Sequence, residues 1–384
     1  MKSLNFAIIG DAHIDKDFSA FDAALAVIDN NLTDFVFIPG DLFELRRPDD
    51  DVVSHVKNAF SSRKKTTFVI ACGNHDPFTI DSPYKSGKWP ENVHIFTENH
   101  VEMKEFQSKF DETNLITIDR AFSDGNIFAT KKGIRIYGAS FGSHYEQNTL
   151  FCDKTKSKLP KLLSGYVNVL VMHGDFSETS SFNPLNPEVI REYGFDICAV
   201  GGSHEYFKNG EFLCSGIICG RNFDETGDKG IIVGEILEDG SIKTEFVPLG
   251  VDKYELITYD VTELATFSAK NVAEHIKELA GEGTSQKITL TGSVRYGEKI
   301  DIETLKNELL TKFKAVEIVD KTEHSDSLSM ISHEKTPRGI FARILLDKAK
   351  RIACEEDSPY KAGDIDGAAD IAFKFLESNG GVGK

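Results

Sequence analysis

Short apolar runs alternate with longer amphipathic segments along the first 80 residues. The apolar runs cover residues 5–9, 35–38 and 67–71, and helix-compatible segments at 19–30 and 50–61 lie between them. Continuously apolar strands are typical of strands that are buried on both faces of a parallel sheet. Because strand and helix alternate, we expect these three strands to pair in parallel, as successive βαβ units of an α/β domain.

The strand pattern continues to about residue 250, where the first domain is expected to end. Further strands of this domain are predicted at 134–138, 167–172, 197–200, 212–218 and 230–236. A second α/β unit is predicted from segments at 254–261, 271–280, 287–294, 302–313 and 316–319. We therefore expect a first domain at 1–250, a small α/β domain at 251–325 and a helical region at 326–384.

The C-terminal region contains two amphipathic segments, 340–353 and 365–376, with a break between them that contains Gly and Asp. An apolar stripe on such a helix has to be covered by another surface. The two segments either pack within the chain or dock on a partner, and the sequence leaves both arrangements open.

The composition is that of a folded globular chain of 384 residues, with 40% hydrophobic and 27% charged residues. The formal charge of −17 argues against a generally basic surface for nucleic acid, although it leaves room for a local basic groove. The six cysteines form no C-x-x-C pair and are interpreted as reduced, and no apolar run is long enough to cross a bilayer. A cytoplasmic protein without membrane contact is expected.

Polar side chains with metal-ligand chemistry follow five of the predicted strands. The segments are Gly10-Asp11-Ala12-His13, Gly40-Asp41, Gly73-Asn74-His75-Asp76, His173-Gly174 and Gly201-Gly202-Ser203-His204. In parallel α/β sheets the functional crevice lies beyond the carboxyl ends of the strands, where residues distant in sequence converge. Any one of these residues alone is more often a helix cap, a turn former or a structural histidine. Five at the same position, in a chain with 11 histidines, indicate one site.

The side-chain types predict that this site binds divalent metal ions. Carboxylate, imidazole and carboxamide ligands together favour a borderline-hard ion, with manganese as the first choice and iron or zinc as alternatives. Asp41 is the natural bridge between two ions, and such a pair of ions is a clamp for in-line displacement at phosphorus. The expected chemistry is hydrolysis of a phosphoester.

These residues resemble the five-part motif of the calcineurin-like metallophosphoesterases, and the resemblance covers about the first 220 residues. It implies an α/β sandwich built of βαβ units, followed here by a small α/β capping domain and a helical C-terminal tail. Within that superfamily, segments 40–44, 136–138 and 220–230 resemble the SbcD-type DNA repair exonucleases. The unit at 251–325 resembles the capping domain of those enzymes.

The resemblance implies two metal sites that share one carboxylate. The first ion would be held by Asp11, His13, Asp41 and His204. The second ion would be held by Asp41, Asn74 and His173. By the same analogy His75 would protonate the leaving oxygen, Asp76 would orient His75, and a polarised water would attack the phosphodiester.

The resemblance also implies partners. An SbcD-type subunit works with an SbcC-like ATPase and cuts DNA in a manganese-dependent reaction, so DNA ends or single strands and such an ATPase are expected. A homodimer is left open. Arg46 and Arg47 follow the second ligand segment and either contact a phosphate backbone or are solvated.

The sequence departs from the family pattern at one ligand position. The family motif ends Gly-His-x-His, whereas this chain has Gly202 where the first of these histidines is expected. The second ion would then bind weakly unless Glu205 or His144 replaces the missing ligand; His144 is otherwise interpreted as a surface residue. Glu44 stands where aspartate is common in the family and is expected to lie behind the ligands.

Three functions fit these observations. The first is an exonuclease subunit, and the second is a phosphodiesterase that acts on a smaller nucleotide substrate. The third is a scaffold subunit that is catalytically weakened because Gly202 replaces a metal ligand. Salt-sensitive binding of linear DNA distinguishes the first from the second. The substitution Gly202→His, which would restore an imidazole, is the expected test of the third.

Overall fold

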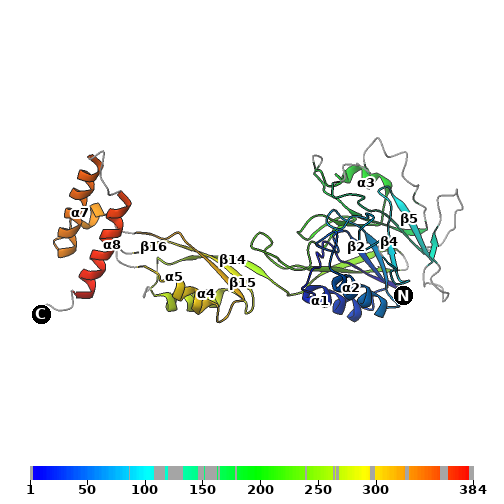
Figure 1. Cartoon of the computed structure of the whole chain (residues 1–384), viewed down its shortest axis with the longest axis horizontal. Coiled ribbons are helices and arrows are strands. Elements are labelled where there is room, and N and C mark those ends of the chain that lie inside the picture. Colours follow the sequence, from blue (N-terminus) through cyan, green and yellow to red (C-terminus); the bar gives the residue numbers. More distant parts are fainter. Residues whose placement is uncertain are drawn as a thin grey trace. The chain divides into compact units, whose positions relative to one another are not determined.

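The computed structural model describes residues 3–85, 87–107, 117–119, 133–145, 151, 162, 165–177, 180–237, 240–262, 264, 268–294, 299–324, 328–354 and 362–379. The chain divides into two compact units, Met1–Lys253 and Tyr254–Lys384 (Figure 1). The further division expected between residues 325 and 326 stays a prediction.

Two β-sheets packed face to face form the first unit. The first sheet has the order β13-β12-β1-β2-β3-β4, with β1 Ser3–Ile8, β2 Phe35–Pro39, β3 Thr67–Ala71, β4 Val93–Ile95, β12 Gly230–Leu237 and β13 Ile242–Pro248. The second has the order β10-β11-β9-β8-β7-β5-β6, with β5 Glu102–Gln107, β6 Thr117–Asp119, β7 Gly133–Ala139, β8 Tyr166–His173, β9 Ile197–Gly201, β10 Phe207–Asn209 and β11 Phe212–Cys214. Phe6 and Phe37 of the first sheet share one buried cluster with Ile136 and Val169 of the second.

Helices cover the outer faces of this sandwich. α1 (Ser19–Asn30) and α2 (Asp50–Ser62) bury Phe21 and Phe60 in a cluster with the outward-facing side chains of the first sheet. α3 (Pro187–Tyr193) packs against the second sheet, and Figure 1 shows it on the side opposite to α1 and α2. The predicted α/β sandwich is confirmed.

The first three strands pair in parallel, as the sequence pattern predicts. β1 pairs with β2 and β2 pairs with β3, both in parallel, and every residue of β2 and β3 is buried. β7, β8 and β9 of the second sheet are parallel as well. The carboxyl ends of each parallel set therefore lie along one edge of the corresponding sheet.

Some predicted boundaries are wrong. The strand expected at 212–218 ends at Cys214, because Gly216 takes a left-handed conformation with φ 71° and the chain turns away. The strand expected at 287–294 is interrupted at Gly292, with φ 98°. The sequence pattern also does not predict α3, whose seven residues are too few to show a helical period.

The second unit begins with a small β-sheet that is covered by helices. Its parallel strands follow the order β14-β15-β17, with β14 Tyr254–Asp260, β15 Ser285–Thr291 and β17 Ala315–Asp320, and β16 Ser293–Val294 pairs separately with β18 Glu323–His324. Helices α4 (Ala269–Leu279) and α5 (Ile302–Leu309) lie together on one side of this sheet (Figure 1). Val272 and Leu305 of these helices are buried in one cluster with Ile288 and Leu290 of β15.

Three helices complete the second unit: α6 Leu328–Ile331, α7 Pro337–Cys354 and α8 Ala362–Asn379. Their apolar faces form a separate cluster in which Ala342 of α7 and Phe373 of α8 are fully buried. The amphipathic C-terminal segments thus pack on one another within the chain.

Candidate metal centre

The five predicted ligand segments converge at the strand ends of the sandwich. Asp11 follows β1, Asp41 follows β2, and the segment 74–76 follows β3, while His173 closes β8 and His204 follows β9. The backbone leaves β1 and β2 through left-handed conformations that non-glycine residues rarely adopt, at Asp11, His13 and Asp41. Such conformations persist only where the surrounding structure enforces them, and they cluster at functional sites.

One group of ligand atoms belongs to Asp11, Asp41 and His173, which are 1%, 3% and 2% exposed. Nδ1 of His173 lies 3.5 Å from Oδ1 of Asp11, and Nε2 of His173 lies 3.5 Å from Oδ2 of Asp41. Oδ1 of Asn74 lies 2.8 Å from the same Nε2 atom. The three ligands predicted for the second ion are therefore together, and Asp11 joins them.

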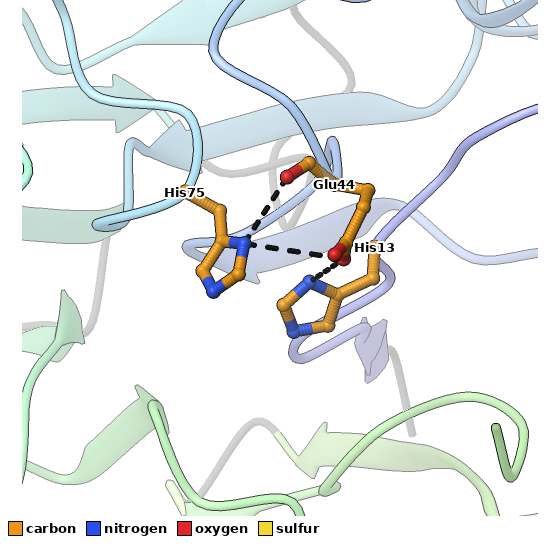
Figure 2. A group of neighbouring side chains, drawn as sticks. All are labelled: His13, Glu44 and His75. Atoms are coloured by element: carbon orange, nitrogen blue, oxygen red, sulfur yellow. Dashed lines mark hydrogen bonds and ion pairs between the residues drawn. The ribbon is translucent and has the colours of Figure 1, made fainter. Parts of the chain in front are cut away.

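A second group consists of His13, Glu44 and His75 (Figure 2). Oε2 of Glu44 lies 2.7 Å from Nδ1 of His13 and 3.9 Å from Nδ1 of His75. Nε2 of His13 lies 3.9 Å from Oδ2 of Asp41, so Asp41 adjoins both groups. Glu44 was expected behind the ligands, yet its carboxylate lies between two imidazoles.

The donor atoms fit divalent metal ions. Both ring nitrogens of His13 are buried and make no hydrogen bond within the described residues, even though the Glu44 carboxylate lies close to one of them. Buried polar atoms are almost always satisfied, so an orphaned pair of this kind calls for a ligand. Each group also brings its donor atoms within 4.8 Å of one another. Carboxylate and imidazole donors at this density suit a divalent ion.

Burial sets the protonation of the metal-free site. Burial, opposed by His173 and assisted by the neighbouring Asp41 carboxylate, raises the pKa of Asp11 to about 7. Burial lowers the pKa of His13 to about 3, so this ring is neutral and keeps one unprotonated nitrogen that can bind a metal ion. Burial alone would lower the pKa of His173, but the carboxylates of Asp41 and Asp11 raise it overall.

The close approach of two ligand loops requires glycine at position 73. A Cβ atom on Gly73 would lie 2.1 Å from Oδ1 of Asp41 and 2.5 Å from its backbone nitrogen. The same carboxylate oxygen accepts a 2.9 Å hydrogen bond from the backbone N–H of His75. The loop after β3 thus wraps directly around the shared carboxylate, which a larger residue would displace.

Gly202 does more than leave out an imidazole. Its backbone N–H donates to both oxygens of Asp11 at 3.0 Å, and its φ is +100°. A Cβ atom there would lie 2.7 Å from the carbonyl oxygen of Gly174. The expectation that Gly202→His would simply restore a ligand is therefore wrong, because a side chain at this position strains the backbone and pushes against a neighbouring loop.

Neither residue considered as a replacement ligand occupies that role in the structure. The carboxylate of Glu205 pairs with Lys229 at 2.7 Å, and the Glu205 side chain is 68% exposed. His144 lies beside the centre, where its Nδ1 is 2.8 Å from the carbonyl oxygen of Asn74. His144 is exposed, as expected, but it contacts the backbone of a ligand segment.

Asp76 lies under the centre. Its carboxylate accepts hydrogen bonds from the backbone N–H groups of Phe43 and Gly73, at 3.0 and 2.8 Å, and from the hydroxyl of Tyr84, and it is fully buried. These contacts tie two ligand loops together. The described hydrogen bond of the His75 ring runs instead from Nδ1 to the carbonyl oxygen of Glu44, at 3.1 Å. The catalytic roles of His75 and Asp76 stay predictions.

A carboxylate that the sequence reasoning missed positions His204. Oε1 of Glu225, a residue only 7% exposed, lies 2.8 Å from Nδ1 of His204. Arg221 donates to Glu225 at 2.8 Å and to Glu44 at 3.1 Å, so it links the two carboxylates. The His204 ring packs against His13 with centroids 5.3 Å apart. The motif-like segment 220–230 was the sequence signal for this network.

The profile of the calcineurin-like phosphoesterases matches residues 4–213, which is more than half of the chain. The chain belongs to this family. The family consists of metal-dependent phosphoesterases, and the divalent ions that its members use would be held here by the two groups of ligand atoms described above. Within the described ranges, no helix of this phosphoesterase combines the length and the apolar character that a bilayer crossing requires.

Two known proteins are similar to this phosphoesterase. The uncharacterized metallophosphoesterase YhaO of Bacillus subtilis (strain 168) is 23% identical over 297 residues, which cover 70% of this chain and 66% of YhaO. This chain thus spans slightly less than two thirds of that relative. The solved structure of GAP50, the anchor in the inner membrane complex of Plasmodium, is 15% identical with a TM-score of 0.42, covering 65% of this chain and 86% of GAP50.

Removing the Glu225 carboxylate is expected to weaken metal binding. In Glu225→Ala the His204 ring loses its buried partner, and loss of such an outer partner typically lowers metal affinity about 10- to 100-fold. Titration calorimetry with Mn²⁺ measures this. Glu188→Ala is the matched control, because it breaks an exposed Glu–Arg pair with Arg191. Equal affinities of the two variants would show that Glu225 does not position a ligand.

Metal uptake is expected to release protons and to weaken as the pH falls. Asp11, with a pKa of about 7, is largely protonated at pH 6, and an ion must displace that proton. Each displaced proton lowers the apparent affinity up to about tenfold per pH unit below the pKa. Calorimetry at pH 6 and 8, in buffers of different ionisation enthalpy, counts the protons. A pH-independent affinity would contradict this, and Asp22→Asn, at an exposed carboxylate, should leave the trend unchanged.

Proposed function

We propose that the protein is a manganese-dependent phosphodiesterase that acts on DNA ends, as an SbcD-type exonuclease subunit. The observation that carries this proposal is the position of Asp41, whose carboxylate adjoins both groups of ligand atoms. Two ions that share a carboxylate are suited to clamp the attacking and leaving oxygens of a phosphodiester. When bound, such ions stabilise negative charge on phosphorus oxygens and supply a nucleophile at neutral pH.

The protein residues around this centre supply orientation and proton transfer. In the neutral ring, Nδ1–H of His75 donates to the Glu44 carbonyl oxygen, which leaves Nε2 as the nitrogen that can exchange a proton. The His75 side chain is 34% exposed, so substrate can reach it. In the proposed mechanism the protonated ring donates from Nε2 to the leaving oxygen. The carbonyl and the carboxylate of Glu44 both lie at Nδ1 of this ring, at 3.1 and 3.9 Å, and leave Nε2 free of them.

DNA rather than a smaller diester is proposed as the substrate because of the family resemblance. Among the surface charges, one local pair of arginines supports this choice. Arg46 and Arg47, the candidate phosphate contacts, both pair with Asp81. Their side chains remain 53% and 68% exposed, so a phosphate can compete with Asp81 for them. Turnover of small nucleotide diesters without DNA binding is the second candidate.

We also propose that α7 and α8 dock an SbcC-like ATPase. Beyond their buried cluster these helices expose Ile340 and Ile344 on α7 and Ile371 and Phe375 on α8, each more than half exposed. In both helices the two residues are four apart, so they lie on one face. Exposed apolar side chains in such pairs are typical of an interaction surface. A homodimer through the same helices is the alternative.

The four free cysteines in the described part of the chain suit the proposed cytoplasmic location.

The first test is hydrolysis of bis(p-nitrophenyl) phosphate by the purified chain with Mn²⁺. We expect turnover that is lost by more than about 100-fold in Asp41→Asn, because both groups lose a charge there. Asp22→Asn, at a carboxylate that is 54% exposed and pairs with His55 rather than with a candidate phosphate contact, is the control. Absence of turnover at any metal concentration would favour the scaffold function over the phosphodiesterase.

DNA is tested on the same protein preparation. An exonuclease subunit should bind linear DNA with an affinity that falls steeply with salt, and it should shorten labelled ends in Mn²⁺. Hydrolysis of small diesters without either property would support the second candidate function.

The docking surface is tested by the double variant Ile344→Ser, Phe375→Ser. Both side chains are exposed, so the fold should be preserved while association with the ATPase subunit weakens at least about tenfold. Leu32→Ser, at an exposed apolar residue of the first unit, is the control. Unchanged co-purification of the ATPase would place the partner elsewhere.

A further inference from the structure

We infer that Tyr145 and Phe182 form an aromatic platform that stacks a nucleobase of the substrate beside the metal centre. This inference rests on the proposed phosphodiesterase function and deepens it, because it names a base next to the scissile phosphate as a recognised element. Neither aromatic residue belongs to the ligand set or to the sequence motif.

The two rings pack on each other and on a histidine beside the centre. Tyr145 and Phe182 are stacked, with centroids 5.6 Å apart and planes 29° from parallel. The His144 ring meets both of them edge-on, at 4.6 and 5.9 Å. The rings of His144 and His75 are 6.2 Å apart. A continuous row of rings therefore leads from the predicted proton donor to the exposed Tyr145 and the half-buried Phe182.

Hydrogen bonds hold this platform to the ligand segments. Nδ1 of His144 contacts the carbonyl oxygen of Asn74 at 2.8 Å, which fixes the loop that carries Tyr145. The residue after Phe182, Asn183, donates from its side chain to the carbonyl oxygen of His173 at 2.8 Å. Both aromatic residues are thus attached to backbone that also carries a predicted metal ligand. A platform anchored in this way keeps a fixed position relative to the reacting phosphate.

A nucleobase is the ligand that this surface fits. Tyr145 is 63% exposed, an unusual position for a large aromatic ring beside a polar catalytic centre. A base stacked on an exposed aromatic ring adds substantial binding without reading sequence, because every base has a π-face. The base of the nucleotide whose phosphate lies at the ligands is the closest planar group of such a substrate. An unpaired terminal nucleotide presents that face, whereas a base within a duplex does not.

The experiment compares two substrates that differ only in the base: thymidine 5′-(p-nitrophenyl) phosphate and its abasic tetrahydrofuran analogue. We expect the wild-type protein with Mn²⁺ to prefer the thymidine ester by about tenfold in kcat/KM. Tyr145→Ala should remove this preference and leave turnover of the abasic ester unchanged. Tyr145→Phe, which keeps the ring, should retain it. Tyr206→Ala is the matched control, since Tyr206 is an exposed tyrosine that packs on Phe246.

The outcomes separate this inference from the proposed function. Equal kcat/KM for the two esters, or a preference that survives in Tyr145→Ala, would overturn the platform while leaving the phosphodiesterase intact. If neither ester is hydrolysed, binding of fluorescein-labelled oligothymidylate and of an abasic strand of equal length gives the answer. Tighter binding of oligothymidylate that depends on Tyr145 would support the platform without the enzyme activity. Equal binding of the two strands would overturn the platform.

Discussion

The centre depends on keeping several acidic groups buried close to one another. Asp11, Asp41 and Asp76 are all at most 3% exposed. Burial and the neighbouring Asp41 carboxylate raise the pKa of Asp11 and of Asp76, which opposes their ionisation. The protein offsets this with fixed donors, because backbone N–H groups of Gly202 and His75 point at Asp11 and Asp41. A bound divalent ion would neutralise the negative charge of the carboxylates that these donors leave. The protein groups thus balance the negative charge of these buried carboxylates only in part, and this makes the site suited to a cation.

The sandwich makes this arrangement rigid enough to persist. Buried parallel strands end at one edge, and the chain turns off β1 and β2 through strained left-handed conformations. The loops that contain these conformations pack closely on one another. Glycine is found where they approach most closely, as at position 73 against Asp41. Asp76, buried beneath, joins the loops after β2 and β3 through Phe43 and Gly73. The turns that carry the ligands after β1, β2 and β3 are therefore fixed by the packing and hydrogen bonds of the loops on one another.

A second set of charges connects the two faces of the centre. Arg221 links Glu44, beside His13 and His75, with Glu225, which holds His204. One guanidinium thereby couples the orientation of imidazoles that come from both sheets. Gly202, directly after β9, contributes a backbone N–H donor to Asp11 instead of an imidazole, so the set of ligands differs from that of the family motif. Glu44, whose carboxylate lies between two imidazoles, belongs to the other group of candidate ligands, with His13 and His75.

The sequence pattern by itself determined the parallel βαβ units and the strand ends where the ligands lie, because a strand buried on both faces is a continuous apolar run and glycine next to Asp or His marks each turn. The sandwich was expected only from the family resemblance. It predicted that Asp11, Asp41, Asn74 and His173 meet, since strand ends converge in any parallel sheet. Only the tertiary structure placed Glu44 among imidazoles, Glu225 behind His204, and Tyr145 on Phe182. These contacts join loops far apart in the chain, where no periodicity records a neighbour. The left-handed conformation of Gly202 could not be predicted from the sequence either, because glycine permits such a backbone angle but does not require it.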